Sequence, residues 1–291
     1  MSDSRQPVDG ILVIDKPAGW TSHDVVAKVR NQLGVKKVGH AGTLDPMATG
    51  VLVVGIHRAT RLLGYLAETD KEYVATMRLG VVTNTDDADG EVIAEVDASA
   101  VADEAILAAT RALTGDIMQV PSAVSAIKVD GERAYKRARA GETFELSERP
   151  VRVAAFEVVA RRDADVDVRV VCSSGTYVRA LARDVGAALG VGAHLTALRR
   201  TRVGSFTIED ARSLDDDVDG SGCIPLADVV SSMFPRCDVD AETATRVAQG
   251  QRLPLGITGP TGVFGPDGAV VALVEPREDG TTKSLVGFVG G

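Results

Sequence analysis

The chain has 291 residues, 45% hydrophobic and only 4% aromatic, which is enough for one large or two smaller domains with a mainly aliphatic core. No apolar run reaches the length of a membrane span, and the polar start Met1–Pro7 lacks the apolar core of a signal peptide, so we expect a soluble, cytoplasmic protein. The formal net charge of −9 argues, taken alone, against a nucleic-acid partner.

The first part of the chain predicts alternating strands and helices. Apolar runs and two-residue alternation predict strands over 10–15, 51–56 and 72–80. Helical spacing predicts a helix over 24–33 with Ser22 as its N-cap, a short helix over 59–66, and an Ala-rich helix over 101–113. Between them, residues 83–90 form a polar, acidic loop that lacks the ligand spacing of a calcium loop.

Hairpins dominate the second part. We expect strands over 124–129, 151–160, 166–172, 262–273 (two strands around a Pro-Asp-Gly turn) and 284–289, and helices over 132–140, 176–186 and 241–249. This irregular alternation favours an α+β fold with a mixed, mainly antiparallel sheet flanked by helices over a doubly wound parallel sheet.

Composition also suggests the domain boundaries. We expect a tail over 1–9, a main domain over 10–212, an acidic linker over 213–223 and a small β-rich module over 224–291. Residues 209–247 contain ten acidic and three basic side chains, so much of the negative charge is concentrated there. Elsewhere basic residues cluster at 28–37, 128–139 and 199–202, where they form either ordinary solvated faces or local patches for a polyanion.

The cysteines and histidines show no metal-ligand spacing. Cys172, Cys223 and Cys237 lie far apart, which argues against both a zinc site and a disulfide framework. No phosphate-binding glycine motif is present either, so we expect neither a metal nor a cofactor.

One loop stands out as a candidate site. The run 39–46, Gly-His-Ala-Gly-Thr-Leu-Asp-Pro, places the carboxylate of Asp45 directly before a buried strand. An Asp-Pro pair often only starts a turn, and that reading stays open from the loop alone. Further along lie Tyr73 on a strand, Tyr177 and Arg179 at a helix start, and the apolar and basic run 194–202. A carboxylate, an arginine to pair with it and aromatic faces suit an enzyme that acts on a nucleic-acid base.

Seven blocks of sequence, in family order over residues 10–208, resemble the bacterial tRNA pseudouridine synthases of the TruB family. The blocks are 14–17, 39–46, 71–73, 85–90, 120–128, 172–179 and 198–200. The resemblance implies a pseudouridine synthase fold with a PUA-like C-terminal domain of actinobacterial type. It also implies isomerisation of uridine to pseudouridine at position 55 in the T-loop of tRNA, by base flipping and without cofactor or metal.

The resemblance also implies residue roles. Asp45 would be the catalytic nucleophile, Arg179 its ion-pair partner, and Tyr73 a stacking and proton-transfer residue. His40, Tyr177 and Leu198, together with Tyr73, would hold the target nucleotide, although each could instead be structural. An insertion over about 118–148 would grip the T-loop. Candidates for contacts with the RNA backbone are Lys16, Lys37, Lys128, Arg133, Lys136, Arg137, Arg199, Arg200 and Arg202, of which Lys16 and Lys37 could instead be structural.

The expected partner is the T-stem-loop of tRNA, with no obligate protein partner and a monomeric state. A tRNA-binding or folding chaperone that performs no chemistry is the main alternative. A hydrolase with Asp45 as its base is a third reading, but glycoside hydrolysis normally needs two carboxylates. No second carboxylate sits in these motifs, and Asp89 is too loosely placed to serve.

Overall fold

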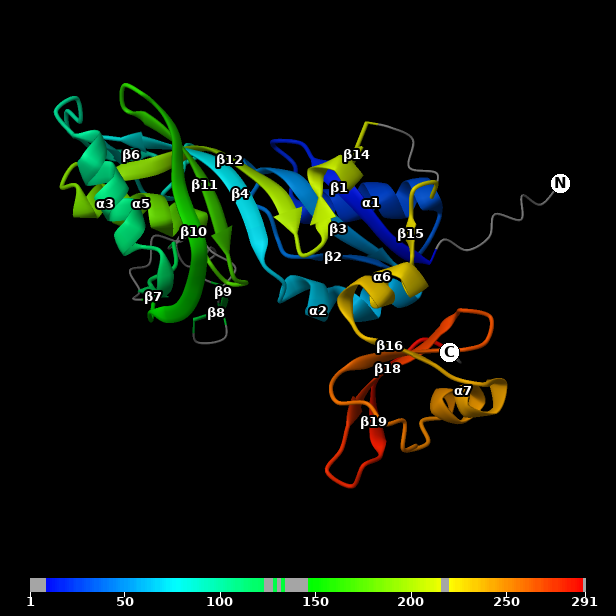
Figure 1. The fold of residues 1–291 in the computed structure, drawn as a ribbon. Coiled ribbons are helices and arrows are strands. Elements are labelled where there is room, and N and C mark those ends of the chain that lie inside the picture. The colour runs from blue at the N-terminus through cyan, green and yellow to red at the C-terminus, as the bar shows by residue number, and fades with distance from the viewer. Residues whose placement is uncertain (1–8, 123–127, 130–131, 134–145, 216–219, 290–291) are drawn as a thin grey trace.

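The computed structural model describes residues 9–122, 128–129, 132–133, 146–215 and 220–289 (Figure 1). These residues form an α+β fold with a large, mainly antiparallel sheet, flanking helices and a smaller C-terminal sheet. The predicted fold class is therefore confirmed. In the described part of the chain, no helix is long and apolar enough to cross a membrane.

The large sheet follows the order β14-β1-β3-β12-β4-β11-β10-β7, with β13 on β12, β15 on β1 and β2 on β3. Within it, β12 pairs with β3 in parallel and with β4 in antiparallel orientation, so it joins the two halves of the sheet. The strands are β1 (Gly10–Lys16), β2 (Val38–Ala41), β3 (Thr49–Ile56), β4 (Lys71–Leu79), β7 (Gly115–Gln119), β10 (Arg149–Arg162), β11 (Asp165–Cys172), β12 (Ala193–Val203), β13 (Phe206–Thr207), β14 (Arg212–Ser213) and β15 (Ile224–Pro225).

Helices cover both faces of this sheet. They are α1 (Ser22–Leu33), α2 (Leu63–Ala67), α3 (Asp103–Ala112), α5 (Val178–Ala188) and α6 (Leu226–Met233), with 3₁₀ turns η1 (His57–Leu62) and η2 (Ile208–Asp210). The remaining described helix, α7 (Ala241–Ala248), packs instead on the smaller C-terminal sheet. The predicted N-cap of α1 is wrong by one residue. Thr21, not Ser22, caps the helix by accepting a hydrogen bond from the Asp24 N–H, and Ser22 is buried.

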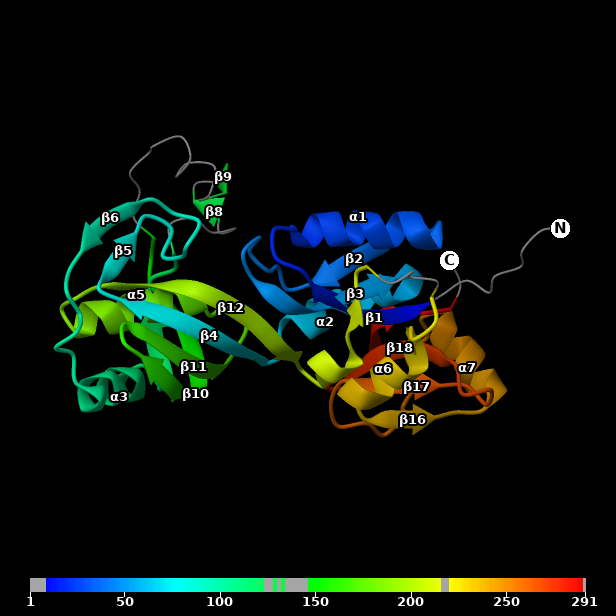
Figure 2. The ribbon, with the colours of Figure 1, turned by 90° about the horizontal axis from the view of Figure 1, so that it is seen from above.

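Side-chain alternation along β1 separates two apolar layers. Leu12 and Ile14 pack with α1 on one face of the sheet, and Ile11 and Val13 pack with η1, α6 and the C-terminal sheet on the other. Figure 2 shows α1 and the C-terminal sheet on opposite sides of β1 and β3. Successive strand side chains point to opposite faces, which is why one apolar run supports both layers.

Two short hairpins lie outside the large sheet. β5 (Val81–Thr83) pairs with β6 (Val92–Glu95), and β8 (Lys128–Val129) pairs with β9 (Glu132–Arg133). The predicted helix over 132–140 is therefore wrong at its start, because Glu132 and Arg133 extend to pair with β8. Residues 124–127 of the predicted strand and 134–140 of the predicted helix lie outside the described residues.

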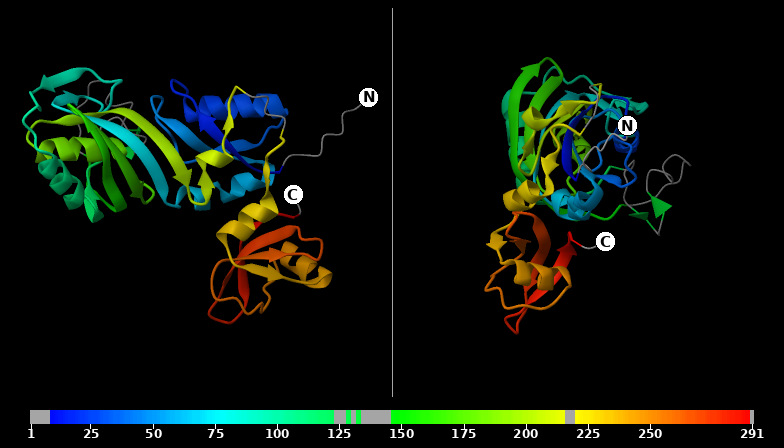
Figure 3. Two further views of the ribbon diagram at one scale, coloured as in Figure 1. Left: turned by 45° about the horizontal axis from the view of Figure 1, so that its top comes forward. Right: turned by 90° about the vertical axis from the view of Figure 1, so that its right-hand side faces the viewer.

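The C-terminal sheet has the order β16-β17-β18-β19, with β16 (Arg236–Asp238), β17 (Thr261–Phe264), β18 (Val270–Pro276) and β19 (Thr282–Gly287). It lies next to the end of the large sheet that contains β1 and β3 (Figure 3). Phe264 and Phe288 join the apolar layer beneath β1, and Arg58 on η1 donates a 2.8 Å hydrogen bond to the Phe288 carbonyl. Because Ile224 and Pro225 still pair with β1, the chain returns to the large sheet before it enters this unit.

Candidate active site

The loop between β2 and β3 carries Asp45, and hydrogen bonds hold the residues on either side of it. The Ser22 hydroxyl accepts a 2.9 Å hydrogen bond from the Leu44 N–H, and the buried Lys16 ammonium donates one of 3.2 Å to the Pro46 carbonyl. Gly50 has φ +99°, and a Cβ there would lie 2.1 Å from the Arg200 carbonyl oxygen. Only glycine allows this close approach of β3 to β12 without a shift of the backbone.

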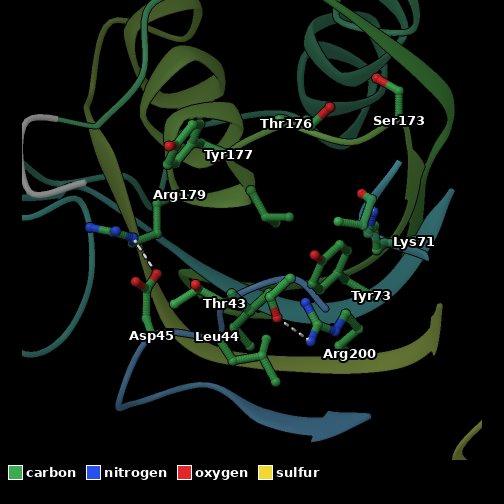
Figure 4. Close-up of a pocket in the computed structure, with 15 residues that line it drawn as sticks. Thr43, Leu44, Asp45, Lys71, Tyr73, Ser173, Thr176, Tyr177, Arg179 and Arg200 are labelled. Atoms are coloured by element: carbon green, nitrogen blue, oxygen red, sulfur yellow. Dashed lines mark hydrogen bonds and ion pairs between the residues drawn. The ribbon is translucent and has the colours of Figure 1, made fainter. Parts of the chain in front are cut away.

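Asp45 faces a cavity of about 270 Å³ between the loop, β4, β12 and the start of α5. Figure 4 shows the Asp45–Arg179 pair on one side of this cavity and Tyr73 with Lys71 on the other. The lining residues are Gly42, Thr43, Leu44, Asp45, Ala67, Lys71, Tyr73, Ser173, Gly175, Thr176, Tyr177, Val178, Arg179, Leu198 and Arg200. Asp45, Tyr73, Tyr177, Arg179 and Leu198, five of the residues singled out in the sequence, therefore line one cavity.

Strand register brings the floor of the cavity together. Arg200 on β12 lies opposite Tyr73 on β4, and Leu198 lies two residues from Arg200 on the same strand. Residues two apart on a strand share a face, so Lys71 and Tyr73 point to the same side. Tyr73 and Leu198 are almost fully buried, which leaves the cavity an apolar and aromatic wall.

The first turn of α5 supplies the cation. The Arg179 guanidinium lies 3.0 Å from the Asp45 carboxylate through Nε and 3.3 Å from the Asp87 carboxylate through Nη1. Nη1 also donates a 2.7 Å hydrogen bond to the Thr85 carbonyl. A cation in the first turn opposes the helix dipole, and these acceptors offset that cost.

Asp87 is itself held by its loop. Its carboxylate accepts a hydrogen bond from the Asp89 N–H at 3.2 Å and one from the Thr85 hydroxyl, and its side chain is only 7% exposed. The Asp86 carbonyl accepts from the Leu195 N–H at 3.0 Å, which ties the loop to β12. The acidic segment 83–90, predicted only as a polar loop, therefore supports the site through its contacts with Arg179.

The electrostatic balance at Asp45 has opposing parts. Burial raises the pKa of the Asp45 carboxyl above its ordinary value, Arg179 lowers it, and the Asp87 charge raises it again. An arginine partner favours the ionised carboxylate, whereas desolvation favours the neutral acid. Such competing shifts are typical of functional carboxylates in cavities.

Two other titratable groups in the cavity are also displaced from their ordinary range. Burial raises the pKa of the Tyr73 phenol, which therefore stays protonated at neutral pH. Burial lowers the pKa of Lys71 to about 8, and its ammonium donates a 2.6 Å hydrogen bond to the Thr69 carbonyl.

Two of the predicted RNA-backbone residues are buried, which argues against a direct phosphate contact for either and agrees with the structural alternative for Lys16. Lys16 is 0% exposed and donates hydrogen bonds to the carbonyls of Pro17, Trp20 and Pro46. Arg200 is 1% exposed and donates to the Val51 and Gly42 carbonyls. Both cations satisfy backbone oxygens of the site, a role that their residue types do not reveal.

The other predicted backbone contacts are distributed differently. Lys37 is exposed. Arg199 and Arg202 are half-buried, the first ion-paired with Asp15 at 2.7 Å and the second bonded to the Gly204 carbonyl at 2.9 Å. Arg133 and Lys128 lie on the short hairpin β8–β9, but their side chains are outside the description, as are Lys136 and Arg137 altogether.

His40, predicted to hold the nucleotide, is not among the lining residues of this cavity. It lies on β2, two residues before Gly42, with its ring 5.4 Å from that of His23 in an edge-to-face arrangement. Burial lowers its pKa to about 4, so the ring is neutral near pH 7.

Several residues of the site were not predicted. Asp87, Lys71, Ser173 and Thr176 contribute to it or to its support, and Arg200 does so in a different role from the one predicted. All five stand within the seven blocks of sequence described above, so membership of a block was the available signal. Among the described residues, no group of three or more His, Cys, Asp or Glu side chains could hold a metal ion.

Family models match most of the chain. Residues 30–178 match the model for the N-terminal domain of the TruB family pseudouridylate synthases. Residues 179–219 match the tRNA pseudouridylate synthase B C-terminal domain, and residues 234–289 match the C-terminal model of tRNA pseudouridine synthase II.

Close relatives and solved structures agree with these matches. The tRNA pseudouridine synthase B of Thermobifida fusca is 57% identical over 97% of this chain and 99% of its own length, and that of Rhodococcus jostii is 58% identical over 92% and 90%. A chain from a Cbf5-Nop10-Gar1 complex superposes with a TM-score of 0.73 at 28% identity, covering 100% of this chain and 90% of that one. A chain from an H/ACA RNP bound to a substrate RNA containing 2'-deoxyuridine gives a TM-score of 0.72 at 26% identity, over 97% and 85%. The chain belongs to the TruB family of pseudouridylate synthases.

Proposed function

We propose that this chain isomerises one uridine to pseudouridine in the T-loop of tRNA, at position 55, using Asp45 as the nucleophile. The observation that carries the proposal is the Asp45–Arg179 ion pair at 3.0 Å on the wall of a cavity that Tyr73 faces from the opposite side. The names of the close relatives, tRNA pseudouridine synthase B, support the tRNA substrate.

The cavity suits a base removed from its stack. An enzyme that acts on a base inside folded RNA must extrude it and hold it against apolar or aromatic surfaces. Tyr73, Tyr177 and Leu198 provide such surfaces around Asp45. Arg179 opposes the effect of burial on the pKa of the Asp45 carboxyl and so favours the ionised form, which is the form that attacks.

In the reaction, the bond between the ribose C1' and uracil N1 breaks and a bond from C1' to uracil C5 forms. The proton on C5 leaves, and N1 takes up a proton. Tyr73 lies against the uracil in this proposal, and its phenol, which its raised pKa keeps protonated, is placed to move a proton. His40 would act at the edge of the site, on β2, in holding the opened T-loop.

Substrate contacts outside the cavity also remain proposals. Exposed Lys37 and half-buried Arg199 and Arg202 are proposed to contact phosphates. The grip of the 118–148 insertion on the T-loop, the PUA-like character and boundaries of the C-terminal unit, the monomeric state and the cytoplasmic location stay predictions from the sequence.

Tritium release tests the proposed function directly. A tRNA transcript labelled with tritium at uracil C5 should lose its label at position 55 with the wild type, and a transcript with cytidine at that position should lose none there. Asp45→Asn should abolish release, while Asp70→Asn, the same change at an exposed carboxylate nearby, should leave it intact. Release that survives in Asp45→Asn would remove Asp45 from its role. No release from the wild type would favour the tRNA-binding chaperone.

A further inference from the structure

The buried carboxamide of Gln119 lies behind the wall of the cavity. Gln119 ends β7 and is 2% exposed. Its Oε1 accepts a 2.9 Å hydrogen bond from the Tyr177 N–H, and its Nε2 donates one of 3.2 Å to the Tyr177 carbonyl. A single side chain therefore satisfies both backbone polar groups of one residue in the cavity wall.

Tyr177 is the N-cap of α5. Its backbone is extended, with φ −103° and ψ 107°, and its own side chain makes no capping hydrogen bond. Its carbonyl also accepts the first helical hydrogen bond, from the Leu181 N–H at 3.1 Å. The Gln119 carboxamide thus fixes the point at which the helix begins, where backbone groups otherwise lack partners.

A second link lies one helical turn further along α5. Arg183 donates a 2.7 Å hydrogen bond to the Val120 carbonyl, and it also reaches the Asp86 carboxylate at 3.5 Å. Residues 179 and 183 share a helix face because they are four apart. Residues 119 and 120 therefore hold the first two turns of α5 at two points.

Arg179 depends on this placement. It stands two residues after Tyr177, and within the described part of the chain it makes directed contacts with Asp45, Asp87 and the Thr85 carbonyl. Hydrogen bonds and charge-assisted pairs weaken steeply when their distance and angle change. A small displacement of the helix start would therefore loosen the Asp45–Arg179 pair without altering either residue.

We propose that Gln119 is a positioning residue of the isomerase, which sets the Asp45–Arg179 ion pair by fixing the backbone of Tyr177. This role rests on the proposed function. Gln119 contributes to the rate of the chemical step and not to the affinity for RNA, because its carboxamide is buried and directed at the protein backbone.

Two variants of Gln119 test the role. Gln119→Glu keeps an acceptor for the Tyr177 N–H but places a carboxylate oxygen against the Tyr177 carbonyl. Gln119→Met removes both hydrogen bonds at similar volume. The matched controls are Gln251→Glu and Gln251→Met, at an exposed glutamine of the C-terminal unit. Single-turnover tritium release at saturating enzyme reports the chemical step, and filter binding reports the affinity for tRNA.

Both Gln119 variants should lose about 10- to 100-fold in single-turnover rate, the loss typical of misplaced catalytic groups, with tRNA affinity within about two-fold of the wild type. The acidic limb of the rate–pH profile should also move to higher pH, because a loosened Arg179 opposes protonation of Asp45 less. The charged groups around Asp45, namely Arg179, Asp87 and Lys16, are unchanged in both variants, and because Gln119→Met adds no charge, the limb of that variant reports the placement of Arg179 alone. A merely structural defect would lower the melting temperature without moving this limb.

Wild-type rates and pH profiles in both variants would overturn the positioning role and leave the proposed function standing. A loss of activity that weaker tRNA binding explains in full would do the same. A wild type that releases no tritium would overturn the proposed function, and the positioning role with it. Should the Gln119 variants fail to fold, Arg183→Met removes the neighbouring link at a partly exposed site. An unchanged rate and pH profile in that variant would overturn the premise that the links of residues 119 and 120 to α5 set the Asp45–Arg179 pair, and the proposal with it.

Discussion

Asp87 shares the Arg179 guanidinium with the candidate nucleophile: its carboxylate lies 3.3 Å from Nη1, while Nε lies 3.0 Å from Asp45. One buried cation therefore serves two carboxylates. The second carboxylate orients Arg179, but it also adds negative charge near Asp45 and so raises the pKa of that group. Removing Arg179 should therefore raise the pKa of Asp45, and removing the Asp87 charge should lower it.

The first prediction concerns Asp87→Asn. Loss of a nearby negative charge should lower the pKa of Asp45, so the acidic limb of the single-turnover rate should move to lower pH. The rate near pH 7 should nevertheless fall by about 10-fold, because Arg179 loses a charged anchor of a kind typically worth 1.5–3 kcal/mol. Rate–pH profiles of tritium release measure both effects, and a limb that moves upward would contradict the prediction and show that the loosening of Arg179 outweighs the lost charge of Asp87.

The second prediction is the converse, for Arg179→Met. Without the cation, burial and the Asp87 charge act on Asp45 unopposed, so its pKa should rise and activity should be lost at a higher pH as the solution is acidified. Near pH 7 we expect a rate loss of about 100-fold or more, consistent with the loss of a group that acts on the reacting centre. Affinity for tRNA, measured by filter binding, should change little. A wild-type acidic limb would show that Arg179 does not keep Asp45 ionised.

The third prediction separates an exposed cation from a buried one. Lys37→Met should weaken tRNA binding. It should also reduce the slope of the logarithm of the binding constant against the logarithm of salt concentration by the amount expected for about one phosphate contact. Arg200→Met should instead lower the melting temperature, because the Val51 and Gly42 carbonyls lose their donors inside the protein. Binding isotherms at several salt concentrations and thermal unfolding decide the matter. A reduced salt slope in folded Arg200→Met would return Arg200 to the RNA interface.

The fourth prediction concerns Lys16 and alkaline pH. Burial lowers its pKa from 10.5 to about 8 in the folded protein, so between these values the unfolded chain binds a proton that the folded one has lost. The free energy of unfolding should therefore receive from Lys16 a contribution that grows as pH rises through this window. In Lys16→Met that contribution should be absent, although Lys71, with a pKa of about 8, should still provide its own. Urea unfolding of both proteins from pH 7.5 to 10 tests this, and parallel curves would contradict it.

Local patterns predicted much of the fold, because they report which face of an element is buried. The β10–β11 hairpin, the mainly antiparallel sheet and α7 follow from alternation and helical spacing. No local pattern in the sequence predicts that β4 lies between β12 and β11, because β4 is far along the chain from both strands. Pairing over such separations is decided by the packing of the whole core.

The sequence predicted the central residues of the candidate site but not the residues that hold them in place. Asp45 and Arg179 were assigned to each other through the resemblance of their motifs, and the structure brings them to 3.0 Å. Arg200 was predicted to contact RNA, and Lys16 either to contact RNA or to be structural, whereas both are buried and donate to backbone carbonyls. Asp87 has acidic neighbours in an exposed-looking run, and nothing local distinguishes the carboxylate that turns inward. Burial of a charged group depends on tertiary partners that a local pattern does not contain.

The pairing of β1 has a consequence for how the protein is made. β1 pairs with β3 about 40 residues later in the chain but with β14 and β15 only about 200 residues later. Because contacts at long sequence separation close slowly, the β14 and β15 edge of β1 stays without these strands until residues 212–225 have been synthesised. The Asp45 loop follows directly on β2, and its Gly42 carbonyl accepts a hydrogen bond from Arg200, so the pocket around Asp45 is completed only after β12 has been synthesised.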